Sequence, residues 1–300
     1  MTNDPNTLSQ LASCLRCLSD YQLIAARTSL LCTIASNGLL DPLVIDFNNR
    51  IIANGGAPLS SSTENALNTF IKGMKTDGIW TKMLVLNVFL PDSLAACLTP
   101  LIVGNGSNPW ANNGFTAANL STAGLTQPSG AAIYLNTGCN VSTIFSSVTD
   151  SGFTWASACA GLMNMRANAF DGGSMAGLYA DASNARCGLF QAWDVQPALI
   201  SGSPSKLFCS ASRAGATATI IQKNTANGSS STSGAAGLTP PNLVLYTHCW
   251  NINNAPGTFP ASGDTTCSLI AIHTALSATD TDNFYARFQT FRNAIGGGSV

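Results

Sequence analysis

The sequence predicts a mainly β protein with an α-helical N-terminal region, an antiparallel β-sandwich in the C-terminal part, and a C-terminal helix. Three observations support this fold class. Apolar residues recur at helical spacing through residues 1–103. From residue 124 onwards they form short runs that Gly, Ser, Asn and Pro clusters separate, as in a series of strands. Residues 277–296 return to helical spacing.

The helical region, residues 1–103, contains several patterns that begin helices. Capping-box pairs, or an N-cap followed by proline, occur at Ser19 with Gln22, Asp41 with Pro42, and Ser61 with Glu64. The apolar stripes that follow are Leu23, Ala26, Leu30 and Ile34; Val44, Phe47 and Ile51; and Leu67, Phe70, Ile71 and Met74. Residues 84–88 alternate as a strand would. Residues 104–123 are expected to form a linker or long loop.

The predicted sandwich, residues 124–300, opens with strand-forming residues at 133–135, followed by the turn signal Asn136-Thr137-Gly138. Further strands are expected at residues 175–179, 186–192, 207–212, 216–222, 243–249 and 268–274. Such a series is typical of an antiparallel sandwich of the jelly-roll kind. The low-complexity residues 224–237 are expected to form a surface loop.

The closing helix, residues 277–296, begins at a further capping box, formed by Ser277 and Asp280. Its aromatic stripe consists of Phe284, Phe288 and Phe291, which share one face with Ile295. We expect this stripe to pack against the sandwich, and a partner-binding helix is the alternative. Gly296-Gly297-Gly298 is expected to release the chain from the helix.

Composition limits the partners. The 300-residue chain is 45% hydrophobic but only 9% charged, against about a quarter in ordinary soluble proteins, and its formal net charge is −1. Phosphate contacts need clustered Lys and Arg, so we expect no nucleic-acid partner. Low charge suits a protein that is packed in an assembly, and equally a Ser/Thr-rich soluble protein.

The start of the chain, MTNDPNTLSQ, lacks the basic residues and apolar run of a signal peptide. No stretch reaches the roughly 18 apolar residues that span a bilayer. We therefore expect synthesis in a cytoplasm and no membrane insertion.

Catalytic residue patterns are scarce. Glu64 is the only glutamate, whereas glycosidases of sandwich folds use two carboxylates about 5 to 10 Å apart. The aspartates after residue 103 are Asp150, Asp171, Asp181, Asp194, Asp264, Asp280 and Asp282, and none has a carboxylate partner at i+2 on a strand. His248 and His273 lie in apolar strands, so we expect core histidines. We therefore predict that the chain is not an enzyme and has no cofactor or metal. The alternatives are an Asp-only hydrolase and a Ca²⁺ site built from loop Asp and Asn residues with backbone carbonyls.

Three tryptophans have both a structural and a functional interpretation, and one arginine has a structural one. Trp155, Trp193 and Trp250 are expected in the core, and a sugar-binding platform is the alternative. Arg213 is expected to be a surface charge at a turn between strands.

Ten cysteines are unusual for a protein made in a cytoplasm. Cys14 and Cys17 have metal-type C-x-x-C spacing, and Cys32 offers a third ligand, but the sequence supplies no fourth one nearby. Most cysteines are expected to be small buried hydrophobes. Cys14, Cys17 and Cys32 are candidates for disulfides or inter-subunit thiols once the protein leaves the cell.

Four stretches resemble a class of tailed-bacteriophage virion structural proteins that carry a concanavalin A-like (laminin-G-like) jelly roll after a helical N-terminal part. They are Cys14-Leu-Arg-Cys17 with Leu30-Leu31-Cys32; Phe47-Asn-Asn-Arg50 through Gly56 with residues 67–80; Gly124-Leu125 with Tyr134-Leu135-Asn136-Thr137-Gly138; and residues 276–296.

The resemblance implies a virion location after synthesis in the host bacterial cytoplasm, and no catalytic residues carry over. Its expected role is a non-enzymatic particle component, such as a capsid decoration or a neck or tail appendage. Residues 1–103 would dock on the virion and the sandwich would project outward. Expected partners are other virion proteins and further copies of the chain, as a dimer or trimer. The alternative is a tail-fibre adhesin that binds a host surface glycan.

Overall fold

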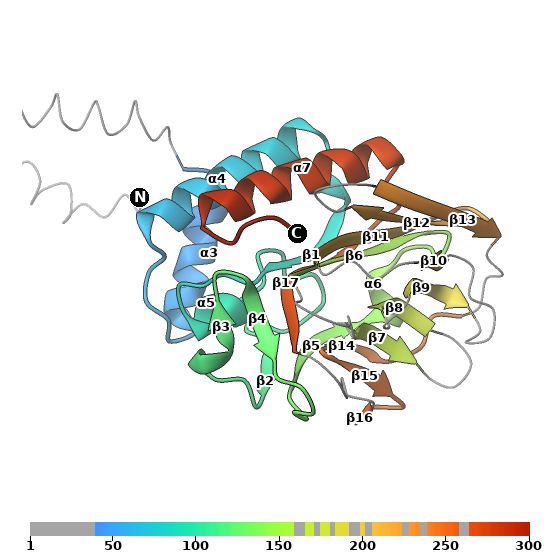
Figure 1. The fold of residues 1–300 in the computed structure, drawn as a ribbon, viewed down its shortest axis with the longest axis horizontal. Coiled ribbons are helices and arrows are strands. Elements are labelled where there is room, and N and C mark those ends of the chain that lie inside the picture. The colour runs from blue at the N-terminus through green and yellow to red at the C-terminus, as the bar shows by residue number, and fades with distance from the viewer. Residues whose placement is uncertain are drawn as a thin grey trace, which may run out of the picture. The chain divides into compact units, whose positions relative to one another are not determined.

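Two β-sheets, nearly all antiparallel, make up most of the described protein (Figure 1). The computed structural model describes residues 40–158, 166–170, 175–180, 184–191, 199–201, 206–223, 228–234, 239–257 and 264–300. Pro42–Val300 form one compact unit. The helices predicted before residue 40, and the candidates Cys14, Cys17 and Cys32, lie outside the described residues.

Sheet A has eight strands, and its central strand β17 pairs with β6 on one side and with both β4 and β1 on the other. In spatial order its strands are β13 (Gly228–Gly234), β12 (Thr217–Lys223), β11 (Lys206–Ala214), β6 (Asp150–Ala158), β17 (Thr265–His273), β4 (Gly124–Gln127) and β3 (Leu120–Ser121), with β1 (Met83–Val88) beside β17.

Sheet B has nine strands, and β15 is the exception to its antiparallel pairing because it runs parallel to β7. In spatial order they are β10 (Leu199–Ser201), β9 (Asn184–Gln191), β8 (Met175–Ala180), β7 (Arg166–Phe170), β14 (Val244–Thr247), β5 (Tyr134–Asn140) and β2 (Ala111–Asn113), with β15 (Cys249–Ile252) and β16 (Ala255–Gly257) off this path.

The hydrophobic core lies between the sheets. Phe153 and Trp155 of β6 belong to the same buried cluster as Leu135 of β5 and Leu245 of β14. Because neighbouring strand residues point to opposite faces, Thr154 lies on the other face of sheet A. A core shared by two antiparallel sheets confirms the predicted sandwich-like, mainly β fold with a C-terminal helix.

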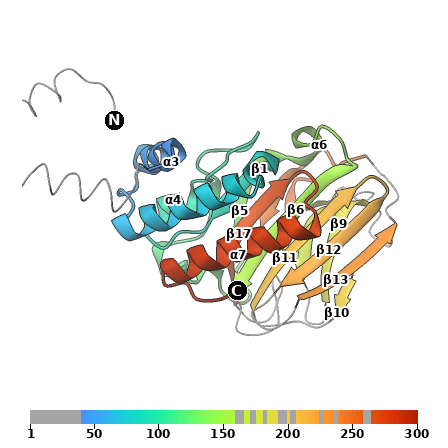
Figure 2. The same cartoon turned by 90° about the horizontal axis from the view of Figure 1, so that it is seen from above.

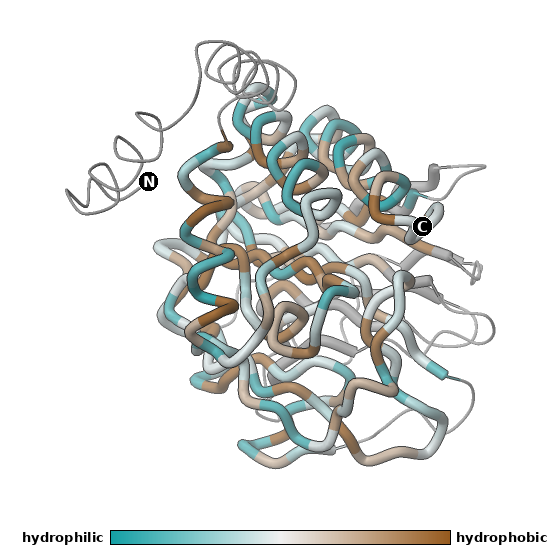
Figure 3. Tube along the Cα trace, turned by 90° about the vertical axis from the view of Figure 1, so that its left-hand side faces the viewer, coloured by the Kyte–Doolittle hydropathy of each residue, from teal (hydrophilic) through white to brown (hydrophobic). Residues whose placement is uncertain are grey.

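Of the longer described helices, α4 (Ser61–Thr76) and α7 (Ala278–Ala294) lie side by side on the outer face of sheet A, and α3 (Pro42–Ala53) lies beside α4 and away from the strands (Figures 1 and 2). Shorter elements are α5 (Leu94–Leu98), α6 (Val141–Ile144), η1 (Trp80–Lys82) and η2 (Ala117–Asn119). Hydrophobic and hydrophilic residues alternate along the described helices (Figure 3), as amphipathic helices require. No described helix has the length and apolar composition needed to cross a bilayer.

The predicted boundary near residue 103 does not correspond to a structural break. β1 pairs with β17 in register from Val85 to Val88, so part of the helical region is built into sheet A. Residues 104–123, expected as a linker, contain β2, η2 and β3, and these strands pair with β5 and β4. Short polar strands carry a weak hydrophobic pattern, because their pairing partners and not their own side chains stabilise them.

Three local predictions are also corrected. The turn expected at Asn136-Thr137-Gly138 is an irregularity within β5, where Gly138 has φ +68° and the strand continues to Asn140. The loop expected at residues 224–237 contains β13. The chain is not released after α7, because Arg292 donates to the Gly297 carbonyl and the Val300 N–H donates to Gln289.

Candidate functional site

The α4–α7 helix pair forms the first candidate site, and local sequence begins both helices. Ser60 caps α4 by accepting the Thr63 N–H, while Asp92 accepts from the Ser60 N–H at 2.9 Å and the Thr63 hydroxyl at 2.9 Å. α7 begins at the predicted capping box of Ser277 and Asp280. These caps satisfy N–H groups that a helix start leaves without partners.

An aromatic cluster holds the two helices together and against sheet A. The Phe70 ring of α4 lies 5.4 Å from the Phe291 ring and 6.4 Å from the Phe284 ring of α7. Phe208 of β11 meets Phe284 edge to face at 5.3 Å. The predicted aromatic stripe of α7 therefore packs on the sandwich, and each ring pair adds about 0.5–1.5 kcal/mol beyond its burial.

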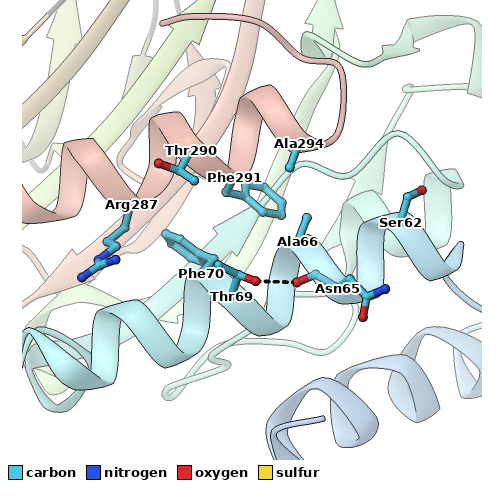
Figure 4. Close-up of a pocket in the computed structure, with 9 residues that line it drawn as sticks. All are labelled: Ser62, Asn65, Ala66, Thr69, Phe70, Arg287, Thr290, Phe291 and Ala294. Carbon is cyan, nitrogen blue, oxygen red and sulfur yellow. Dashed lines mark hydrogen bonds between the residues drawn. The ribbon is translucent and has the colours of Figure 1, made fainter. Parts of the chain in front are cut away.

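A hollow of about 280 Å³ opens between α4 and α7 on the side away from sheet A (Figure 4). We call it the α4–α7 groove; its lining residues are Ser62, Asn65, Ala66, Thr69, Phe70, Arg287, Thr290, Phe291 and Ala294. Figure 4 shows the Phe70 and Phe291 rings between the helices and small side chains around them. The groove therefore has an apolar floor and a rim of small, mostly uncharged residues.

Arg287 closes one end of the groove. Its guanidinium donates to both carboxylate oxygens of Asp77, at 2.8 and 3.1 Å. The side-chain hydrogen bond from Arg287 holds the pKa of Asp77 below its ordinary value, and burial opposes this effect. The Arg287 stem lies against Gly73, where an added Cβ would be 2.6 Å from the Arg287 Cδ. Gly73 thus allows the ion pair to cross between the helices.

A second candidate surface lies on sheet B, away from α3, α4 and α7. The rings of Tyr134 on β5 and Tyr246 on β14 lie 5.0 Å apart at an interplanar angle of 35°. Tyr134 is partly exposed, whereas Tyr246 is 8% exposed. Asn136 lies on the same face of β5, two residues from Tyr134, and its side chain accepts the Gly138 N–H.

Both histidines are buried, as predicted. His273 bonds to Thr154 Oγ1 at 2.9 Å and to the Thr274 carbonyl at 2.7 Å, and burial lowers its pKa to about 4. Burial likewise lowers the pKa of His248 to about 4. His248 lies against the Phe89 and Phe115 rings. Neither histidine is positioned to exchange a proton with a substrate in solution.

The described aspartates of the sandwich fix the backbone. Asp150 accepts the Ala275 N–H at 2.7 Å and Asp264 accepts the Ser129 N–H at 2.9 Å. Asp171, Asp181 and Asp194 lie outside the described residues. Within the part of the chain that the structure describes, no group of three His, Cys, Asp or Glu residues is suited to a metal ion.

The side chains with two interpretations are mostly structural. Trp155 and Trp250 are buried, in line with the core interpretation, and Trp193 lies outside the described residues. The prediction for Arg213 is wrong: this side chain is buried and donates to the Leu189 carbonyl of β9 at 3.0 Å. It therefore links sheet A to sheet B, which residue spacing along one strand cannot reveal.

The described cysteines fit the prediction of small buried hydrophobes. Cys97 and Cys139 are free and buried, and burial raises the pKa of Cys139 to about 12. A thiol of such high pKa has little thiolate at neutral pH and is unreactive. The core positions of Cys209, Cys249 and Cys267 are buried as well.

Neither a family model nor a curated protein matches the chain. Among solved structures, it resembles domain 4 of AbnA, a GH43 extracellular arabinanase from Geobacillus stearothermophilus, solved with arabinotriose. The identity is 13%, the match covers 68% of this chain and 98% of that domain, and the TM-score is 0.41. An arabinofuranosidase complexed with arabinofuranosyl-α-1,2-xylobiose is 15% identical at a TM-score of 0.33, with 59% of this chain and 41% of that chain covered.

This finding corrects the prediction that the chain is not an enzyme, because the similar structures belong to an arabinanase and arabinofuranosidases. The prediction relied on carboxylate spacing along the sequence, whereas a fold brings together carboxylates from distant strands. The likeness concerns the sandwich fold and assigns no activity, substrate or catalytic residue to this chain.

Proposed function

We propose that the chain is a structural component of a bacteriophage particle, with its helical side docked on the virion and its sandwich directed outward. In this proposal the sandwich is of the concanavalin A-like jelly-roll type. The resemblance of four sequence stretches to virion proteins supports the proposal. The virion, reached after synthesis in the bacterial cytoplasm, is its location, and other virion proteins are its partners.

The observation that carries the proposal is the α4–α7 groove. It has an apolar floor at Phe70 and Phe291, and its rim residues are small and mostly uncharged. The Asp77 carboxylate neutralises Arg287, so the groove presents no strong field to a partner. Such a surface suits insertion of an apolar side chain from a helix of a particle protein.

A deletion of the helical region cannot test this docking. Removing residues 1–103 would delete β1 from sheet A and α4 from the aromatic cluster, so the remainder would lose its fold. A point variant is therefore needed. Thr290 is exposed on the groove rim, and Thr290→Arg places a long charged side chain over the apolar floor.

The experiment compares Thr290→Arg with Ala111→Arg, a matched change at an exposed position on β2 of sheet B. Phage particles are assembled with each variant and separated on a density gradient. We expect Thr290→Arg to stay in the soluble fraction and Ala111→Arg to enter the particles. Undiminished incorporation of a folded Thr290→Arg chain, judged by circular dichroism, would overturn docking through the groove.

Binding of a host surface glycan is the second candidate, and the Tyr134–Tyr246 pair favours it. Two neighbouring aromatic rings, tilted by 35° and with Tyr134 the more exposed, supply an apolar platform for a sugar ring, and the Asn136 amide supplies a hydrogen bond. On a glycan array, Tyr134→Ala should abolish any specific signal while Tyr285→Ala, on the opposite side of the sandwich, should preserve it. A signal that survives Tyr134→Ala would exclude this surface.

A further inference from the structure

The strand β13 forms one outer edge of sheet A and, with seven residues, is the longest described strand at an edge of either sheet. It pairs with β12 over all seven of its residues without a register shift. The other end strands, β3, β2 and β10, have two or three residues. β1, which pairs with β17, has six residues, and its other side is bridged by Leu86 and Ile102. β10 of sheet B lies beside β13 without pairing to it, so no described strand pairs with the outer edge of β13.

This edge lacks the features that keep sheet edges from pairing. Native edge strands are protected by shortness, by Lys or inward charges, by Pro, or by bulges. The sequence of β13, Gly-Ser-Ser-Ser-Thr-Ser-Gly, contains no charged residue and no proline, and its pairing with β12 is regular. No described strand is paired with its outer backbone N–H and C=O groups, which are therefore suited to accept a further strand.

The sequence of β13 is also self-complementary in residue type. Antiparallel pairing of two copies about a two-fold axis at Ser231 places residues of similar type opposite one another. The pairs between the copies are Gly228 with Gly234, Ser229 with Ser233, Ser230 with Thr232, and Ser231 with Ser231. Directly opposed Ser and Thr residues stabilise an antiparallel pair, whereas like charges would oppose it. A two-fold contact needs this property, since the same patch serves both partners.

We propose that β13 is the surface through which two copies of this chain pair, extending sheet A across a molecular two-fold axis at Ser231. A second copy fits better than an unrelated peptide. A foreign strand is recognised through side-chain pockets or charge, and the small uncharged residues of β13 offer neither. A second copy of β13, in contrast, places residues of the same type opposite one another. The inference does not depend on the function proposed above.

Charge substitution at Ser231 tests the proposal, because in the proposed dimer Ser231 of one copy lies opposite Ser231 of the other. The full-length protein, Ser231→Lys, Ser231→Glu and their equimolar mixture are compared by analytical ultracentrifugation over a range of concentrations. A seven-residue strand pair is a small contact, so the wild type should dimerise weakly, toward twice the 31.0 kDa chain mass. Each variant alone should dimerise at least about tenfold more weakly, and the mixture should recover dimers through opposite charges.

Ala216→Lys is the matched control, since it adds the same charge at an exposed position in the β11–β12 connection. It should dimerise as the wild type does. Circular dichroism and thermal unfolding of each variant establish that the chain is folded. A wild type that is monomeric at every concentration would overturn the proposal. A dimer that neither Ser231 variant weakens would equally exclude β13 as the contact, as would a mixture of folded variants that stays monomeric.

Discussion

Arg287 of α7 and Asp77 at the end of α4 form a bidentate ion pair, although 210 residues separate them in the sequence. The pair crosses between the helices over Gly73, and its Arg287 lies at one end of the α4–α7 groove. A helix from the N-terminal region and the closing helix thus act as one layer on sheet A.

Removal of this ion pair should cost little stability. Arg287→Ala and Asp77→Asn should each lower the free energy of unfolding by about 0.5–1 kcal/mol, since the Arg287 side chain is 41% exposed and solvent screens the pair. Urea denaturation at pH 7 measures the loss. In the double variant the two losses should not add, because both remove one interaction.

The same pair should show a defined pH dependence. The pKa of Asp77 is lowered in the folded protein by its hydrogen bond with Arg287. The pair therefore contributes stability above the ordinary carboxyl pKa of 3.8, and the contribution disappears as pH falls through the lower folded value. The stability difference between wild type and Asp77→Asn should shrink as pH is lowered below 3.8. A difference that stays constant down to pH 2 would contradict this.

Gly73 should resist a change that normally stabilises a helix. Glycine to alanine in a helix interior gains about 1 kcal/mol, but a Cβ at Gly73 would lie 2.6 Å from the Arg287 Cδ and displace the ion pair. Gly73→Ala should therefore gain nothing or destabilise the wild type. In an Arg287→Ala background the same change should gain about 1 kcal/mol in urea denaturation. Equal effects in both backgrounds would show that Arg287 does not contact Gly73.

Truncation of the aromatic cluster should be far more costly. Phe70→Ala leaves a cavity among Phe284, Phe288 and Phe291, so the free energy of unfolding should fall by about 3–5 kcal/mol. Phe70→Leu should recover part of the loss. A cost below 1 kcal/mol, measured by urea denaturation, would mean that the helices contribute little to the fold.

Acid should destabilise the protein through its buried histidines. The pKa of His273 is lowered to about 4 by burial, whereas an unfolded histidine has the ordinary value of 6.5. Between these values the unfolded chain binds more protons, so stability falls as pH decreases from about 6.5 to about 4. His273→Gln should reduce the slope of unfolding free energy against pH in this window. His248 should contribute in the same sense.

Local sequence determined much of the fold. The Ser277–Asp280 capping box fixed the start of α7, and the Phe spacing fixed its buried face. The short apolar runs indicated strands because alternate residues of a half-buried strand must be apolar, and β12 follows this pattern, with Ala218 and Ile220 buried and Thr217 exposed. These features depend on neighbours within a few residues, so a sequence pattern contains them.

Contacts between distant segments had to come from the tertiary structure. The pairing of β1 with β17, the link from Arg213 to Leu189, and the Arg287–Asp77 pair each join residues far apart in the chain. The spacing of apolar residues along the sequence does not predict such contacts, because their free energy depends on which surfaces the whole fold brings together. Sequence therefore determined most of the helices, strands and buried apolar residues, but not the strands β2, β3 and β13 or the burial of Arg213. The packing of the two sheets and the helical layer decided where the candidate surfaces lie.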